Sequence, residues 1–274
     1  MRRKAIPSAI FALVLSSTSA GAPSSARADL ALDVSPVRIE ISTEPGAECT
    51  DAVTVQNTAT EAVRLRCYVE DWTMTEDGTP VFRPAGALPR SASPWIDWGP
   101  SDVLLEPGES KLVRITARVP HLLAEGGYHT SLLLESIPIR PAERGSRQMF
   151  VRGRVACMIY VRVGHPRRSA EIVSLSASAR DERRYLRVEV ANTGEDFVRL
   201  SGSAALLTAD GRDGGGCDLP DVPILPGKRR WVEIEVPRSG SMDITLARVT
   251  IDIPDVGILV GECPLTAEGG VASR

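Results

Sequence analysis

The residues best equipped for chemistry in this sequence are cysteines and histidines, because thiolates and imidazoles bind metals and act as nucleophiles or bases. The chain has five cysteines and three histidines: Cys49, Cys67, Cys157, Cys217, Cys263, His121, His129 and His165. No two cysteines are spaced as C-x-x-C, and no histidine stands at metal-ligand spacing from a cysteine. We therefore expect no metal and no cofactor. Because five is odd, at least one thiol is free or pairs between chains, while Cys217 and Cys263 either pair or stay reduced.

Other catalytic patterns give no stronger signal. The sequence has no Gly-x-Ser-x-Gly elbow, phosphate-binding loop or paired-carboxylate motif. The segment Asp210-Gly211-Arg212-Asp213 lacks the ligand spacing of a calcium loop and predicts a hairpin turn. The four tryptophans could form a sugar platform, but packing against strands or loops explains them better. Nothing in the sequence requires an enzyme, and we expect that the protein is not one.

The first 28 residues have the features of a signal peptide. Arg2, Arg3 and Lys4 precede an apolar stretch, and a run of small residues ends in Ala26-Arg27-Ala28, which matches an A-x-A cleavage site. No later stretch approaches the roughly 18 consecutive apolar residues that a membrane-spanning helix needs. We expect cleavage before Asp29 and export of the mature protein.

The charge balance argues against a nucleic-acid partner. The whole chain has a net charge of −3, and its hydrophobic content of 43% excludes general disorder. The signal peptide holds four basic residues and no acidic one, so the rest of the chain is more acidic, with a net charge of about −7. Binding nucleic acid needs clustered positive charge.

After Asp29 the hydrophobic pattern has a period of two, which is typical of half-buried β-strands. Val113, Ile115 and Ala117 alternate with Leu112 and Arg114, for example. Similar patterns predict strands at residues 32–41, 51–56, 63–70, 127–137 and 149–163, and again at 186–191, 197–208, 230–236, 244–253 and 258–263. We expect an all-β fold of two tandem immunoglobulin-like β-sandwich domains with a cleft between them.

An internal repeat supports this division. Asn57-Thr58 followed by Val63-Arg64-Leu65 recurs, with identical spacing, as Asn192-Thr193 followed by Val198-Arg199-Leu200. The asparagines are expected in turns, where their side chains bond to nearby backbone. Residues 164–169 have the composition of a linker. We therefore expect a signal peptide over residues 1–28, an N-terminal domain over 29–165 and a C-terminal domain over 166–274.

Four stretches of the first domain carry a resemblance to a known family. They are Val34-Ser35-Pro36-Val37-Arg38-Ile39, Tyr68-Val69-Glu70-Asp71, Leu105-Glu106-Pro107-Gly108-Glu109 with Val113-Arg114-Ile115, and Leu133-Leu134-Glu135-Ser136-Ile137-Pro138. In these stretches the chain resembles the PapD-like periplasmic chaperones of pilus (fimbrium) assembly. The resemblance covers about residues 30–165, and the second domain matches only as a generic immunoglobulin-like module.

The resemblance implies a periplasmic chaperone without catalytic activity. Its expected partners are pilin-like or other secreted β-sandwich subunits and an outer-membrane usher. Such chaperones lend the subunit a β-strand and hold its terminal carboxylate with basic residues in the cleft. The first-strand arginine of the family falls on Arg38, whereas the lysine on its last strand has no match. Arg154 or Arg162 could replace that lysine, and each of these arginines could instead be an ordinary surface charge.

The strand that begins at Met149 would be the one that is lent. Met149, Phe150 and Val151 lie early enough to enter the groove of a client, whereas the later apolar residues of this strand belong to the domain's own core. The alternative is an ordinary terminal strand. The alternative function is then a structural or adhesive immunoglobulin-like protein of the cell envelope, without chaperone activity.

Overall fold

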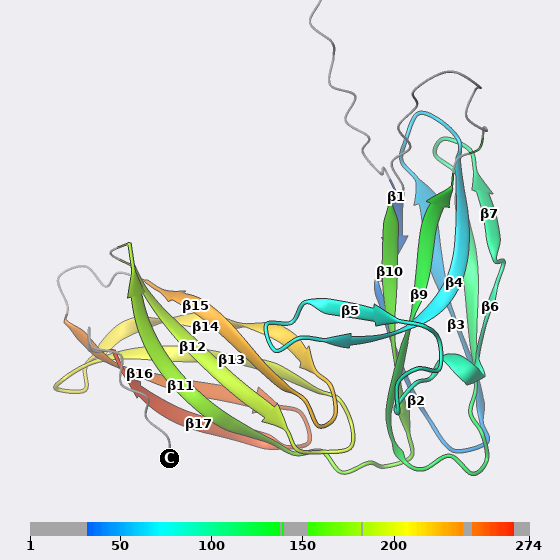
Figure 1. Ribbon diagram of the computed structural model, residues 1–274. Coiled ribbons are helices and arrows are strands. Elements are labelled where there is room, and N and C mark those ends of the chain that lie inside the picture. Colours follow the sequence, from blue (N-terminus) through cyan, green and yellow to red (C-terminus); the bar gives the residue numbers. More distant parts are fainter. Residues whose placement is uncertain (1–31, 138, 140–152, 182, 238–242, 266–274) are drawn as a thin grey trace, which may run out of the picture.

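The computed structural model describes residues 32–137, 139, 153–181, 183–237 and 243–265. Over these residues the chain forms β-strands and one short 3₁₀ turn, η1 (Ser93–Trp95). The strands build two β-sandwiches that form the two arms of an L (Figure 1). In this described part of the chain there is no helix with the length and apolarity to cross a membrane. The predicted fold class of two tandem β-sandwiches is confirmed.

The first sandwich packs a four-stranded sheet against a larger one. Its strands are β1 (Leu32–Ser35), β2 (Arg38–Thr43), β3 (Glu48–Asn57), β4 (Val63–Met74), β5 (Pro80–Arg83), β6 (Ile96–Gly99), β7 (Asp102–Leu105), β8 (Ser110–Arg118), β9 (Gly126–Ile137) and β10 (Arg154–Val163). One sheet has the order β1-β3-β8-β6, and the other has the order β2-β10-β9-β4-β5, with β7 also pairing with β4. The predicted alternation on β8 is confirmed, because Val113 and Ile115 are fully buried and Leu112 is 62% exposed.

The first predicted strand is two strands in the structure. The sequence pattern indicated one strand over residues 32–41, but β1 pairs antiparallel with β3 in one sheet, whereas β2 pairs parallel with β10 in the other. The chain changes sheets at Pro36. Proline has no amide hydrogen to donate to a ladder, so it suits a point where strand pairing is interrupted.

The second sandwich is formed by the remaining seven strands. They are β11 (Ala170–Arg180), β12 (Arg183–Asn192), β13 (Val198–Thr208), β14 (Asp213–Ile224), β15 (Arg229–Val236), β16 (Ile244–Ile253) and β17 (Gly257–Pro264). The sheets have the orders β11-β12-β15 and β14-β13-β16-β17. The predicted hairpin turn after β13 is confirmed, since the hydroxyl of Thr208 bonds to Asp210 at 2.5 Å and accepts from the amide of Arg212 at 3.0 Å.

The repeated asparagines have the same structural task in both sandwiches. The side-chain amide of Asn57 donates to the carbonyls of Glu61 and Leu105, and its oxygen accepts from the amide of Ala59. Asn192 repeats this pattern with Asp196, Ile224 and Gly194. Both side chains are buried, so each fixes the turn that follows its strand to a strand further along the chain.

The two sandwiches meet through an aromatic cluster. The rings of Tyr160 on β10 and Phe197, directly before β13, lie 4.7 Å apart. Trp72 and Leu225 complete the buried part of this cluster. The hairpin between β4 and β5 reaches across to the second sandwich, where the amide of Trp231 donates to the carbonyl of Glu76 at 2.8 Å (Figure 1).

Candidate functional site

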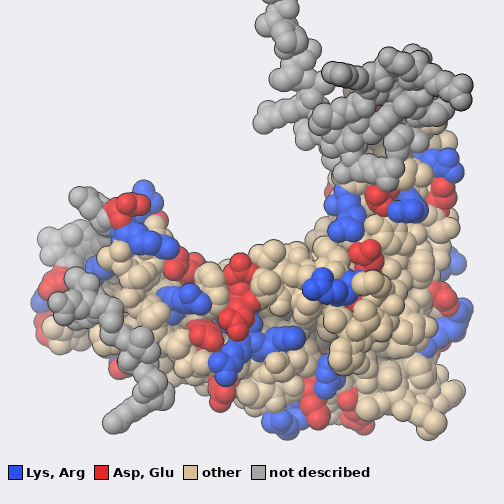
Figure 2. Space-filling view, in the orientation of Figure 1, with Lys and Arg blue, Asp and Glu red and all other residues tan. Residues whose placement is uncertain are grey.

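The hollow between the two sandwiches is bordered by the outer face of the β2-β10-β9-β4 sheet (Figure 2). Residues on this face alternate with core residues along each strand. On β10 the outward set is Arg154, Ala156, Met158, Tyr160 and Arg162, while Cys157, Ile159 and Val161 are fully buried on the inner side. The hollow is therefore lined by a mixed polar and apolar surface that both sandwiches share.

The first four residues of β10 have an open edge. β2 pairs only with Met158 to Val163, so no described strand lies beside Arg154–Cys157 on that side. The amide of Met158 donates to the carbonyl of Val37 at 2.9 Å, toward β2. Because the amides of a strand point alternately to its two sides, those of Arg154 and Ala156 face the open edge. This edge is able to pair with an added strand.

The inner side of the same segment belongs to the core of the first sandwich. Cys157 is fully buried, and its thiol bonds to the carbonyl of Pro36 at 3.3 Å. Burial raises the pKa of this thiol to about 12, so it is not a reactive cysteine. The three residues predicted to enter a client groove, Met149, Phe150 and Val151, lie outside the described residues.

Arg38 begins β2 at the point where the open edge of β10 ends. In the ladder it lies beside Met158, an uncharged residue. Its side chain is 46% exposed, and its Nε lies 3.1 Å from Oε1 of Glu40. The geometry leaves Arg38 accessible to another anion from the hollow, since exposed ion pairs are weak.

The second predicted basic residue, Arg154, lies away from Arg38. Arg154 comes four residues before Met158, which corresponds to about 13 Å along the strand. Its guanidinium lies 3.5 Å from Glu70 on β4 and stacks 4.9 Å from the ring of Phe82 on β5. A hydrogen bond to Tyr68 is the main cause that raises its pKa. Arg154 thus points across β9, on the other side of β10 from β2.

Two arginines of the second sandwich act on the same tyrosine as Arg38, and Arg230 does so from the side of β4, where its Nη1 lies 3.6 Å from the sulfur of Met74. Burial raises the pKa of Tyr160 to about 12, and the charges that act on its hydroxyl are those of Arg199, Glu40, Arg38 and Arg230. The Nε of Arg230 is buried without a hydrogen-bond partner among the described residues, and burial lowers the pKa of this guanidinium. The sequence analysis missed this convergence, although the internal repeat had already singled out Arg199.

Arg162, the other arginine considered on β10, has a structural partner. Asp196 is fully buried and accepts from Nε of Arg162 at 2.5 Å and from Nε of Arg168 at 2.8 Å. The amide of Phe197 also donates to this carboxylate. Burial raises the pKa of Asp196, while Arg162 and the amide oppose that shift. Arg162 therefore joins β10 to the second sandwich and is neutralised there.

A pocket of about 220 Å³ opens where these groups meet. It is lined by Glu40, Arg162, Arg168, Phe197, Val198, Arg199, Ile253 and Pro254. Both sandwiches and the linker contribute to its walls. Arg162 and Arg168 share the carboxylate of Asp196, while the other two charged residues of the lining, Arg199 and Glu40, pair with Asp221 and Arg38 outside it.

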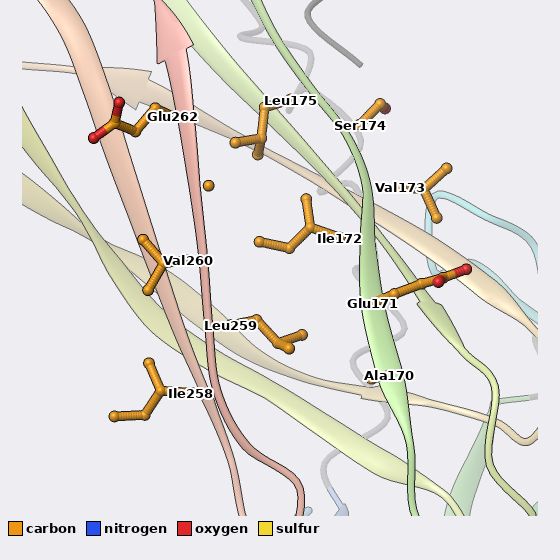
Figure 3. Close-up of a pocket in the computed structure, with 11 residues that line it drawn as sticks. Ala170, Glu171, Ile172, Val173, Ser174, Leu175, Ile258, Leu259, Val260 and Glu262 are labelled. Atoms are coloured by element: carbon orange, nitrogen blue, oxygen red, sulfur yellow. The ribbon is translucent and has the colours of Figure 1, made fainter. Parts of the chain in front are cut away.

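A larger groove of about 820 Å³ lies in the second sandwich between the edge strands β11 and β17 (Figure 3). Ile172 and Leu175 from β11 and Leu259 from β17 line it with aliphatic groups, and its charged lining residues, Glu171 and Glu262, are acidic. It therefore offers no cation to a carboxylate. Nowhere in the described ranges do three or more histidine, cysteine, aspartate or glutamate residues gather as metal ligands.

Comparison with known proteins finds relatives in fold alone. No family model matches the sequence, and no curated protein matches it. Among solved structures, a chain of the chaperone–tip adhesin complex of CFA/I fimbriae is 12% identical over 85% of this chain and 98% of its own, with a TM-score of 0.47. The E. coli chaperone DraB is 15% identical over 87% of this chain and 97% of its own, with a TM-score of 0.45. The chaperone YadV is 11% identical over 86% of this chain and 100% of its own, with a TM-score of 0.47.

Proposed function

We propose that this protein is a periplasmic chaperone that pairs a strand of a pilin-like or other secreted β-sandwich subunit with the open edge of β10 and holds the subunit's terminal carboxylate at Arg38. One observation carries this proposal, namely that Arg38 stands where the open edge of β10 ends. A usher at the outer membrane would receive the subunit.

The geometry defines how such a strand would lie. β2 runs parallel to β10, and a client strand beside Arg154–Cys157 would continue the line of β2. If it also runs parallel to β10, its last residue arrives beside Met158, next to Arg38. The amides of Arg154 and Ala156 would supply backbone hydrogen bonds, which give much of the affinity in strand addition. Residues 149–151 would extend the pairing and offer their side chains to the client.

The chemistry of Arg38 suits the end of this strand. A guanidinium binds a carboxylate with two parallel hydrogen bonds, which fixes both position and direction. Its partner in the free protein, Glu40, is itself partly exposed, so a client carboxylate has to compete with a weak ion pair. Truncating a charge that is desolvated in a complex costs on the order of 2–5 kcal/mol.

Co-purification from the native host tests both halves of the proposal. Ala156→Pro removes an amide that faces the open edge and leaves the pairing with β9 intact, while Ala156→Val retains the amide and is the matched control. We expect Ala156→Pro and Arg38→Ala to lose a β-rich exported partner, identified by mass spectrometry, that wild type and Ala156→Val retain. Thermal unfolding of each variant controls for folding.

Equal capture of the partner by wild type, Ala156→Pro and Arg38→Ala would contradict the proposal. The structural or adhesive envelope protein would then be the better interpretation. Loss with Ala156→Pro but not with Arg38→Ala would retain strand pairing and remove the carboxylate anchor.

A further inference from the structure

The two arginines of the internal repeat have equivalent local contacts but different surroundings. Arg64 on β4 lies 2.7 Å from Asp102, and Arg199 on β13 lies 2.8 Å from Asp221, each aspartate coming from a neighbouring strand or its end. Arg64 is on the outer surface of the first sandwich, where about half of its side chain is exposed. Arg199 is only 21% exposed, because it lies at the junction between the sandwiches. The same repeat position therefore lines a pocket at the junction in the second sandwich and an exposed surface in the first.

Arg199 and Arg38 converge on one place from opposite sandwiches. Arg199 lines the 220 Å³ pocket together with Glu40, and Glu40 is the residue that binds Arg38. Both guanidinium groups also act on the hydroxyl of Tyr160 of β10, whose ring contacts Phe197 of the second sandwich. Nε and Nη2 of Arg199 donate hydrogen bonds to Asp221. The Nη1 atom of Arg199 makes no hydrogen bond within the described residues.

We propose that Arg199 is the second cation of the carboxylate anchor, so that Arg38 from one sandwich and Arg199 from the other hold the client's terminal carboxylate between them. This inference rests on the proposed function and names its binding residue. Glu40 is then the resident anion of the pocket, which the client carboxylate displaces from Arg38.

The other basic residues of the junction are less suited to this role. The ladder neighbour of Arg38 is Met158, and Arg154 points toward β4 and β5. Arg162 and Arg168 share the buried carboxylate of Asp196. Arg199 is held in place by Asp221 through Nε and Nη2, and it lines the pocket. Asp221 thus preorganises the guanidinium, which lowers the entropic cost of binding.

The test measures how much a free carboxylate contributes to binding. A synthetic peptide of alternating valine and serine is prepared with a C-terminal carboxylate and, separately, as the C-terminal amide. Calorimetry gives the affinity ratio of acid to amide for the full mature chain. We expect wild type to prefer the acid, and Arg199→Met and Arg38→Met each to reduce that preference about tenfold or more, which corresponds to about 1.4 kcal/mol.

Two further variants test whether a change in the acid-to-amide ratio is specific to the anchor. Arg64→Met removes the equivalent arginine–aspartate pair of the first sandwich, so it controls for the loss of such a pair, and it should leave the ratio unchanged. Glu40→Gln removes the competing anion and should raise the ratio. A ratio that falls in Arg38→Met but stays at the wild-type value in Arg199→Met overturns the inference and leaves the proposed anchor at Arg38 intact.

The same experiment separates this inference from the function on which it rests. If Arg154→Met lowers the ratio and Arg199→Met does not, the second cation is Arg154 and the inference is wrong. If wild type binds acid and amide equally well, carboxylate anchoring itself is refuted, whatever Arg199 does.

Discussion

The junction between the sandwiches depends on a buried carboxylate, and Asp196→Asn tests how much. The side chain of Asp196 is fully buried between Arg162 of β10 and Arg168 of the linker. Asparagine has nearly the same volume and still accepts a hydrogen bond from the amide of Phe197. The substitution therefore removes the negative charge while it preserves the packing.

The expected cost follows from what the two arginines retain. Removing one partner of a buried ion pair costs about 3–5 kcal/mol when the other charge is left without compensation. Here Arg168 keeps Asp255 at 2.6 Å, and Arg162 keeps the hydroxyl of Ser42 at 3.2 Å. Both guanidinium groups are also partly solvated, with 14% and 26% of their side chains exposed. We expect the contact between the sandwiches to weaken by about 2–3 kcal/mol.

Two measurements report on this contact. Denaturant unfolding followed by tryptophan fluorescence should show a lower free energy of unfolding for Asp196→Asn. Limited trypsin digestion should cut after Arg167 or Arg168 faster than in wild type, because the linker is now fixed by bonds such as that between the amide of Glu195 and the carbonyl of Arg167. Asp102→Asn is the control, since it removes an exposed partner of Arg64 and should change the free energy of unfolding far less.

Equal effects of Asp196→Asn and Asp102→Asn would refute this reasoning. The aromatic contact of Tyr160 with Phe197 would then hold the junction without help from the ion pairs. The same trypsin digestion tests the predicted domain boundary at residues 165/166. Cleavage of Asp196→Asn in the linker should release the two sandwiches as stable fragments.

Three further predictions depend on how deeply polar groups and thiols are buried. Burial lowers the pKa of His129 to about 4 from the ordinary 6.5, so between these pH values the unfolded chain binds more protons, and stability should fall by about 3 kcal/mol as the pH is lowered from 6.5 to 4. Equilibrium unfolding of wild type and His129→Gln over this range checks it, since the variant should lack this dependence. Asn57→Ala and Asn192→Ala should each cost about 2–4 kcal/mol of unfolding free energy, because each loses three hydrogen bonds from a buried amide, and a cost at only one site would contradict their equivalence. Brief alkylation at mildly alkaline pH should add two adducts by intact mass, at the partly exposed Cys49 and Cys217, and a third adduct would show that a buried thiol is accessible.

Local pattern was sufficient to predict most of the fold. The alternation on β8 and the repeat around Asn57 and Asn192 both depend on residues close in sequence, where the period of the backbone determines which side chains are buried. The open question about Cys217 and Cys263 is answered by the structure, in which all five thiols are unpaired. The short strands β5, β6 and β7 and the longer β11 and β14 were not predicted. In β14, glycines and prolines hide any alternation, and two register shifts interrupt its pairing with β13.

The candidate site was harder to predict because it is assembled by tertiary contacts. The sequence identifies Arg38 as a first-strand arginine, but only the parallel register of β2 on β10 shows that its neighbour is Met158 and not a second cation. Arg199 lies far from Arg38 along the chain, and it shares a pocket with Glu40, the ion-pair partner of Arg38, only because the sandwiches dock. No local period encodes such a contact, so sequence reasoning considered only Arg154 and Arg162, both on β10, as the second cation.

The position of Asp196 links the stability of the junction to the proposed anchor. Asp196 follows the repeated asparagine, and two residues later β13 begins and carries Arg199. The bonds of Asp196 to Arg162 and Arg168 therefore fix the start of β13 against β10, and this contact sets where Arg199 stands relative to Arg38. A carboxylate that bridges Arg38 and Arg199 would in turn oppose separation of the sandwiches. Loosening the junction with Asp196→Asn should consequently weaken binding of the acid peptide more than that of the amide, although Asp196 is neutralised by its own arginines and lies outside the anchor.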